Sequence, residues 1–179
     1  MTRNGPIWIS IPVGSNEKRK IDEVMLPADQ SWREKHVSII SQHYSNSPFF
    51  SELSNILFPI LLDESITSLS TLNRKIIRDI CSFLSIKAEF IDVRDLNANG
   101  GRVEKLIQIC REVGAETYIS GSAAKNYIGD EFSNTDVGLE WMEYGPFAEY
   151  PQLCDNFEHH VSIIDLIANT GPEARSFIG

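Results

Sequence analysis

Short strand-like and helix-like segments alternate along the second half of the chain. The strand-like runs cover residues 87–93, 116–120 and 136–141, and helical patterns follow at 103–113, 122–128 and 160–169. Strands that are joined by helices pair in parallel, and the helices then cover the sheet. We therefore predict an α/β fold in which a mainly parallel sheet is covered by helices in a three-layer, Rossmann-like arrangement.

An additional helical segment is predicted at about residues 31–84, where apolar side chains recur at helical spacing. It divides into a helix from Ser31 to Tyr44, a second that starts at Ser47-Pro48 and is ended or kinked by Pro59, and a third over 68–84. Ahead of it, residues 7–13 alternate as in an edge strand, and 21–26 form a possible second strand. An exposed edge strand at 7–13 would allow a homo-oligomer. No linker divides the chain, so we expect a single domain over residues 1–179.

The charge balance limits the classes of partner. With 16 Lys and Arg against 25 Asp and Glu, the net charge is −9, which does not suit a nucleic-acid binder or an anionic membrane surface. No apolar run reaches the ~20 residues that a membrane span needs, so we expect a cytoplasmic protein without membrane insertion. The three cysteines have no metal-ligand spacing. We expect no metal and no cofactor, and small-molecule substrates remain as partners.

One turn has the residue types of an anion site. The run 116–120 ends in Ser120-Gly121, and Ser122 begins a short helix. Helix N-termini present free N–H groups that favour phosphate or carboxylate. Two interpretations stay open: a phosphate site formed by Ser120, Gly121 and Ser122, or an ordinary strand-to-helix turn in which Gly allows a tight bend.

His36 is the candidate base. It lies seven residues before His43, so both side chains can share one helix face, at a wider spacing than a helical zinc pair. Lys35 and His36 beside Trp32 could supply an anion contact and a base next to an aromatic ring. The alternative is that His36 is a partly buried, hydrogen-bonded structural histidine.

Several short motifs occur in a fixed order along nearly the whole chain. They are Trp8-Ile-Ser-Ile-Pro-Val13, Trp32-Arg-Glu-Lys-His36, Tyr44, Ser47-Pro-Phe-Phe50, Arg102-Val-Glu-Lys-Leu-Ile-Gln-Ile-Cys110, Gly114-Ala-Glu-Thr-Tyr-Ile-Ser-Gly121, Tyr127, Tyr150-Pro-Gln152, Ser162-Ile-Ile-Asp-Leu166, Asn169, Gly171 and Pro172. Together these pieces resemble the WbqC-like family of bacterial proteins. The resemblance implies a role in O-antigen and other lipopolysaccharide biosynthesis. It also implies an opening strand–loop–helix unit, which we expect this chain to lack.

For an enzyme, the resemblance implies transfer of glycine or a related acyl group to the amine of a nucleotide-linked amino sugar. His36 would act as the base, and Asp165 would orient a partner group. The expected substrate-binding residues are Lys35, Ser120, Gly121, Ser122, Tyr127, Tyr150 and Gln152. The alternative is a non-catalytic sugar-nucleotide-binding or scaffold protein, or an inactive fragment, because no nucleophile–base–orienter set follows from spacing alone.

Overall fold

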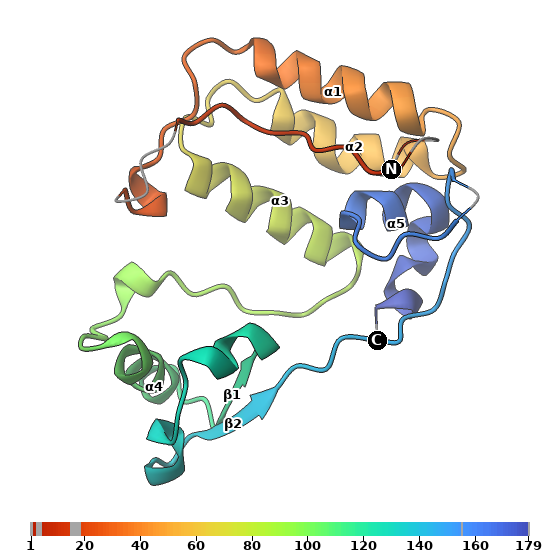
Figure 1. Cartoon of the computed structure of the whole chain (residues 1–179). Coiled ribbons are helices and arrows are strands. Elements are labelled where there is room, and N and C mark those ends of the chain that lie inside the picture. The colour runs from red at the N-terminus through yellow and green to blue at the C-terminus, as the bar shows by residue number, and fades with distance from the viewer. Residues whose placement is uncertain (1, 3–4, 15–18, 155, 179) are drawn as a thin grey trace. The chain divides into compact units, whose positions relative to one another are not determined.

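Helices α1 to α5 and strands β1 and β2 make up most of the regular structure of the computed structural model, which describes residues 2, 5–14, 19–154 and 156–178. Their bounds are α1 Ser31–Tyr44, α2 Phe50–Leu61, α3 Leu69–Phe83, α4 Arg102–Glu112, β1 Thr117–Ser120, β2 Gly138–Trp141 and α5 Ile163–Thr170. The chain divides into a first unit, Met1–Ala88 with Phe147–Gly179, and a second unit, Glu89–Pro146 (Figure 1). In the described part of the chain, no helix has the length and apolar character to span a membrane.

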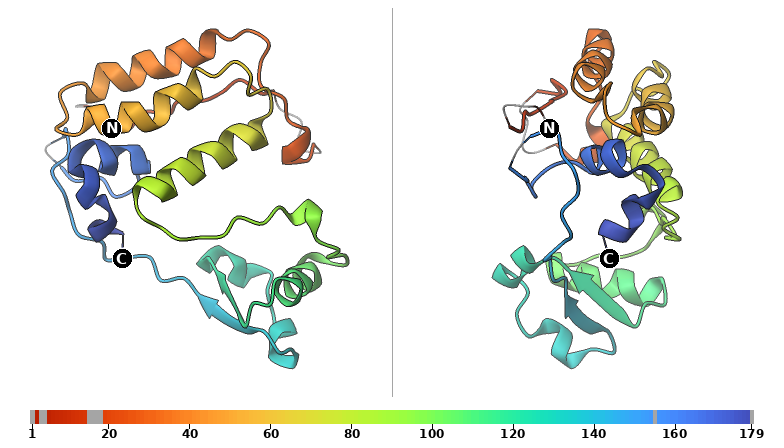
Figure 2. Two further views of the ribbon diagram at one scale, coloured as in Figure 1. Left: turned by 180° about the vertical axis from the view of Figure 1, so that it is seen from behind. Right: turned by 90° about the vertical axis from the view of Figure 1, so that its right-hand side faces the viewer.

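Helix α2 is the central helix of the first unit, where it contacts α1, α3 and α5 (Figure 2). Its side chains at helical spacing are almost fully buried: Leu53 and Ile60 are each 1% exposed, and Leu57 is 5% exposed. Helix α5 adds Ile167, which is completely buried. Each such side chain contributes roughly 1.5–3 kcal/mol by its removal from water. The first unit is therefore held together by apolar packing between helices from both ends of the chain.

A buried arginine joins α1 to the end of α2. Arg33 is 2% exposed, and its guanidinium donates to the carbonyl of Leu61 at 2.8 Å and to that of Ile66 at 2.6 Å. The last carbonyls of a helix have no partner within the helix and carry partial negative charge. Arg33 satisfies one of them, together with a carbonyl of the following loop.

A glycine ends α5. Gly171 has φ +53° and ψ −128°, a conformation that side chains with a Cβ rarely adopt. A Cβ atom built on Gly171 would overlap the ring of Phe49, because its distance to the ring carbons would be shorter than any that real Cβ atoms show. The position thus needs glycine both for its backbone conformation and for the aromatic ring that packs over it.

The second unit has its own apolar core. Strand β1 pairs with β2 in parallel, from Thr117 opposite Gly138 to Ser120 opposite Trp141. Helix α4 packs on β1, and the Tyr118 ring stacks on the ring of Phe132 at 5.5 Å. The buried apolar members of this core are Val103, Ile107, Cys110, Ala124, Ile128, Phe132 and Val137.

The helix predictions for 31–44, 68–84 and 103–113 are confirmed to within about two residues. Gln30 is the N-cap of α1, and Ser31 lies in its first turn with its hydroxyl on the carboxylate of Asp29 at 2.8 Å. Pro59 lies inside α2, which ends two residues later. The final helix begins at Ile163 rather than at residue 160, because Ser162 is its N-cap.

Three strand predictions are wrong. Residues 7–13 are extended but belong to no strand, 21–23 form a 3₁₀ helix, and 87–93 are irregular up to a second 3₁₀ turn. Ile9 and Ile11 pack on the core of the first unit, so an extended segment lying on a core produces the same alternation as a strand. In the described residues the sheet has two strands, which confirms parallel pairing in a mixed α/β protein but does not show a three-layer arrangement.

Candidate functional site

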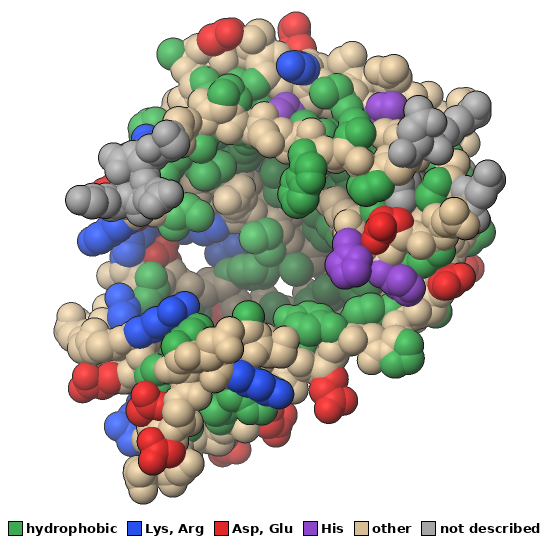
Figure 3. All heavy atoms as spheres, in the orientation of Figure 1, with side chains coloured by type: hydrophobic (Ala, Val, Ile, Leu, Met, Phe, Trp, Pro, Cys, Tyr) green, Lys and Arg blue, Asp and Glu red, His purple; other side chains and the backbone are tan. Residues whose placement is uncertain are grey.

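A groove with a volume of about 590 Å³ lies in the first unit. Its walls come from segment 6–9, from α1, α2 and α3, and from segment 158–164. Three of its lining residues are histidines, namely His36, His43 and His160. Hydrophobic and histidine side chains gather on this face of the first unit (Figure 3). The shared face predicted for His36 and His43 is thus confirmed.

The His36 ring is fixed on α1. Its Nδ1 lies 2.7 Å from the carbonyl oxygen of Trp32, and its ring meets the Trp32 ring edge-on at 5.3 Å. A carbonyl oxygen only accepts hydrogen bonds, so Nδ1 carries the proton. In the neutral ring Nε2 then has the free lone pair. His36 can therefore accept a proton at Nε2 without giving up its structural hydrogen bond.

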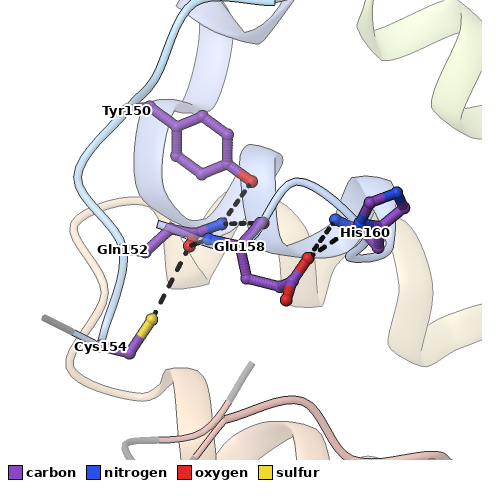
Figure 4. Close-up of polar contacts among 5 residues, drawn as sticks. All are labelled: Tyr150, Gln152, Cys154, Glu158 and His160. Atoms are coloured by element: carbon purple, nitrogen blue, oxygen red, sulfur yellow. Dashed lines mark hydrogen bonds and ion pairs between the residues drawn. The ribbon is translucent and has the colours of Figure 1, made fainter. Parts of the chain in front are cut away.

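Glu158 anchors His160 at another wall of the groove. The Glu158 carboxylate accepts from the backbone amide of His160 at 2.8 Å and lies 3.1 Å from its Nδ1 (Figure 4). These hydrogen bonds, the backbone one first, hold the pKa of Glu158 below its ordinary value. The side chain of Gln152 in turn holds the backbone of Glu158. Its Oε1 accepts from the Glu158 N–H at 2.9 Å, and its Nε2 donates to the Glu158 carbonyl at 3.0 Å.

A buried carboxylate lies behind the groove. Asp165 is fully buried in the first turn of α5. Its Oδ1 accepts from the hydroxyl of Tyr44 at 2.8 Å, and its Oδ2 accepts from the hydroxyl of Tyr150 at 2.9 Å and from the amide of Gln152 at 3.0 Å. The helix N-terminus also favours negative charge at this position.

Both tyrosines are held in their protonated form. Burial is the main cause of a raised pKa at Tyr44, and the negative charge of Asp165 adds to it. The pKa of Tyr150 is raised by burial and by Asp165, against an opposing hydrogen bond from Gln152. Asp165 therefore acts here as a hydrogen-bond acceptor that orients two tyrosine rings.

A smaller cavity of about 280 Å³ lies beside the groove and shares Val161 and Ser162 with it as lining residues. Tyr150 lines this second cavity, whereas Tyr44 lines the groove. The Tyr150 ring meets the ring of Phe157 edge-on at 5.0 Å. Asp165 thus connects, through one tyrosine on each side, the walls of two neighbouring cavities.

The predicted anion turn belongs to the second unit. Strand β1 ends at Ser120, and a 3₁₀ helix covers Ser122–Asn126, so the predicted turn from a strand into a short helix is confirmed. A Cβ built on Gly121 would lie 3.2 Å from the Tyr144 hydroxyl, so a small residue allows that hydroxyl to approach. Phosphate binding at this turn stays a prediction.

The structure brings together some of the predicted site residues. Tyr150, Gln152 and Asp165 are joined by hydrogen bonds, and His36 lines the groove with Tyr44, which bonds Asp165. Lys35 is exposed and does not line the groove. The remaining predicted residues lie in the second unit: Ser120, Gly121, Ser122 and Tyr127.

Tyr127 packs under the Arg102 guanidinium, whose central carbon lies 3.4 Å from the ring centre.

In the described residues, no group of three His, Cys, Asp or Glu side chains could hold a metal ion.

Sequence reasoning missed the roles of Trp8, Tyr44 and Glu158 in this site. Tyr44 and Asp165 are 121 residues apart, so no spacing rule connects them. Trp8 belongs to the segment 7–13 that the alternation predicts to be an edge strand. In the structure it lines the groove, and its side chain is 97% exposed. The sequence signal for this wall is a tryptophan between two isoleucines, at a position where the alternation predicts a side chain turned away from the core.

Comparison with known proteins gives one family. The model of the WbqC-like protein family matches residues 1–177. A Mycobacterium tuberculosis protein named "Uncharacterized protein Rv1507c" is 33% identical over 180 aligned residues, which cover 99% of this chain and 78% of that protein. No solved structure matches the chain.

Proposed function

The chain belongs to the WbqC-like protein family, and from this premise we propose an enzyme of bacterial O-antigen and surface polysaccharide biosynthesis. It transfers glycine or a related acyl group to the amine of a nucleotide-linked amino sugar. The observation that carries the proposal is the geometry of His36. This side chain lines a groove while its Nδ1 donates to the Trp32 carbonyl, which leaves Nε2 as the proton acceptor.

The reaction needs a base because only a neutral amine can attack an acyl carbonyl. The amine nitrogen forms a C–N bond to the acyl carbon, and His36 Nε2 takes one proton from that nitrogen. The bond between the acyl carbon and the leaving group then breaks. The leaving group departs with the electron pair and receives the proton from His36. Such a positioned base contributes typically 10²–10⁴-fold to the rate.

Asp165 has a positioning role in this proposal. Its two oxygens fix Tyr44 and Tyr150, which line the groove and the neighbouring cavity. Gln152 connects the same carboxylate to the backbone of Glu158. The amino sugar would contact Tyr150 and Gln152.

Taken by itself, the second unit is proposed to bind a phosphate at the turn of residues 120–122 and a sugar at Tyr127. Lys35 is proposed as a charge contact at the surface of α1.

A non-catalytic sugar-nucleotide-binding or scaffold protein is the second candidate. The observation that favours it is the set of partners of Asp165. This carboxylate accepts hydrogen bonds from two tyrosines and a glutamine, whereas the carboxylate of a hydrolase-type triad orients a histidine.

Mass spectrometry of the full chain with a nucleotide-linked amino sugar and a panel of activated acyl donors tests the proposal. A product heavier by one acyl group is expected. His36→Ala should lower its rate at least 100-fold while sugar-nucleotide binding, measured by calorimetry, is retained. Ser38→Ala is the control, because Ser38 is exposed on the same helix and does not line the groove.

Two results would refute the enzyme. Sugar-nucleotide binding without turnover, unchanged in His36→Ala, would favour the binding protein. Neither binding nor product across the donor panel would remove both candidates.

A further inference from the structure

The groove is almost without charge. Of the described residues that line it, Glu158 alone is formally charged when histidines are counted as neutral, and that carboxylate is held by His160. No lysine or arginine is among those lining residues. A phosphate needs cationic or multiple N–H donors. The groove is therefore unsuited to the phosphates of a sugar nucleotide and suited to an uncharged ligand.

The groove has a buried apolar floor and an exposed apolar rim. On the floor, Ile40 and Tyr44 are each 3% exposed and Leu57 is 5% exposed. At the rim, Trp8 is 97% exposed and Ile7 is 49% exposed. A ligand that covers a large exposed aromatic side chain removes much apolar surface from water, and this burial favours binding.

We propose that the groove binds the hydrocarbon chain of the acyl donor, with the reactive carbonyl beside His36. This inference rests on the proposed acyl transfer and narrows its donor class to thioesters of apolar acyl groups. In the step, the amine nitrogen forms a C–N bond to the thioester carbon, the C–S bond breaks, and the thiol leaves with the proton that His36 took from the amine. A glycyl group fits the groove less well, because it has no hydrocarbon chain that would cover the apolar floor.

The shape of the groove favours a slender chain over a protein partner. Five separate segments wall it, and its volume of about 590 Å³ lies within the range of small-molecule sites. Protein interfaces of specific complexes are much broader surfaces of about 800 Å² on each partner.

Chain length provides the test. The full chain is titrated by calorimetry with octanoyl and acetyl thioesters of N-acetylcysteamine, which share one polar head, in the absence of an amine acceptor. Each fully buried methylene strengthens binding about fourfold. Burial of half of the six additional methylenes predicts that the octanoyl thioester binds about 60-fold more tightly. Tryptophan emission should also shift to the blue, and this shift should be absent in Trp8→Phe.

A matched pair of variants places the ligand. Ile7→Asp puts a charge at the rim and should weaken octanoyl binding at least tenfold. Ile77→Asp is the control: Ile77 is also 49% exposed, but it does not line the groove. Circular dichroism confirms that both variants are folded.

Equal affinity for the two thioesters, or equal loss in both variants, would overturn the proposal. So would a dimer that Ile7→Asp dissociates and that excludes the thioester, because the groove would then be an interface between two copies. A failure of the proposed acyl transfer can be told apart from a failure of thioester binding, because binding is measured without an amine acceptor. Chain-length-dependent binding without product refutes the enzyme and leaves the chain-binding groove.

Discussion

The hydrogen bonds of Tyr44 and Tyr150 to Asp165 predict a steep loss of stability at alkaline pH. Both hydroxyls have a raised pKa in the folded protein, with burial as the main cause. A tyrosine in the unfolded chain loses its proton at about pH 10. Above that pH the unfolded state binds fewer protons than the folded state, so the free energy of unfolding falls as the pH rises. Below it, the full contribution is present.

The size of this effect follows from linkage. At pH 11 each tyrosine that stays protonated in the fold but titrates in the unfolded chain costs RT ln(1 + 10), or about 1.4 kcal/mol. The two tyrosines together predict a loss of about 2.8 kcal/mol between pH 9 and pH 11. Tyr44→Phe should remove half of this pH dependence. At neutral pH the same substitution should cost about 2 kcal/mol, because Asp165 loses a hydrogen bond that it accepts as a charged group.

Urea unfolding followed by circular dichroism at a series of pH values measures both quantities. Tyr144→Phe is the control, because Tyr144 is 68% exposed and lies in the second unit. If Tyr44→Phe and the unchanged protein lose the same stability between pH 9 and pH 11, the Tyr44 hydroxyl is not bonded to a buried carboxylate and the reasoning fails.

Three further substitutions test separate features. Gly171→Ala should lower the free energy of unfolding by about 2 kcal/mol or more, through the strained backbone and the phenylalanine ring above it, as measured by urea unfolding; an unchanged midpoint would contradict it. Arg33→Met should cost about 3 kcal/mol in the same assay, because two buried carbonyls lose their donor, whereas Arg33→Lys should cost less; equal costs would argue against the hydrogen bonds. His160→Ala should raise the pKa of Glu158 only part of the way toward its ordinary value, because the side-chain contact is lost and the backbone amide of residue 160 still donates, as NMR titration of the carboxylate would detect; an unchanged pKa would show that the imidazole does not contact the carboxylate.

The helices were predictable from sequence because their signals are local. Apolar side chains at helical spacing give the bounds of α1 and α3, and Gly171 gives the end of α5. The extended segment 7–13 was not predictable in the same way. The alternation of apolar and polar residues indicates that one side of the segment is buried, and Ile9 and Ile11 do pack on the core. Whether a neighbouring strand pairs with the segment depends on the rest of the fold.

The candidate site was predictable only in part. His36 and His43 share a helix face, and this follows from their spacing alone. The contact between Tyr44 and Asp165 joins residues 121 positions apart, and no local pattern encodes it. The buried carboxylate of Asp165 accepts from one tyrosine of α1 and from another in the loop before α5, and these two tyrosines are also far apart in the sequence.

The first unit takes its helices from both ends of the chain. During synthesis, α1, α2 and α3 leave the ribosome long before α5, whose Ile167 and Asp165 complete their packing. Part of the apolar surface of these helices therefore stays uncovered until α5 has been synthesised. The second unit draws on one continuous stretch, Glu89–Pro146, and its contacts can form before α5 is made, so we expect the second unit to fold before the first is completed.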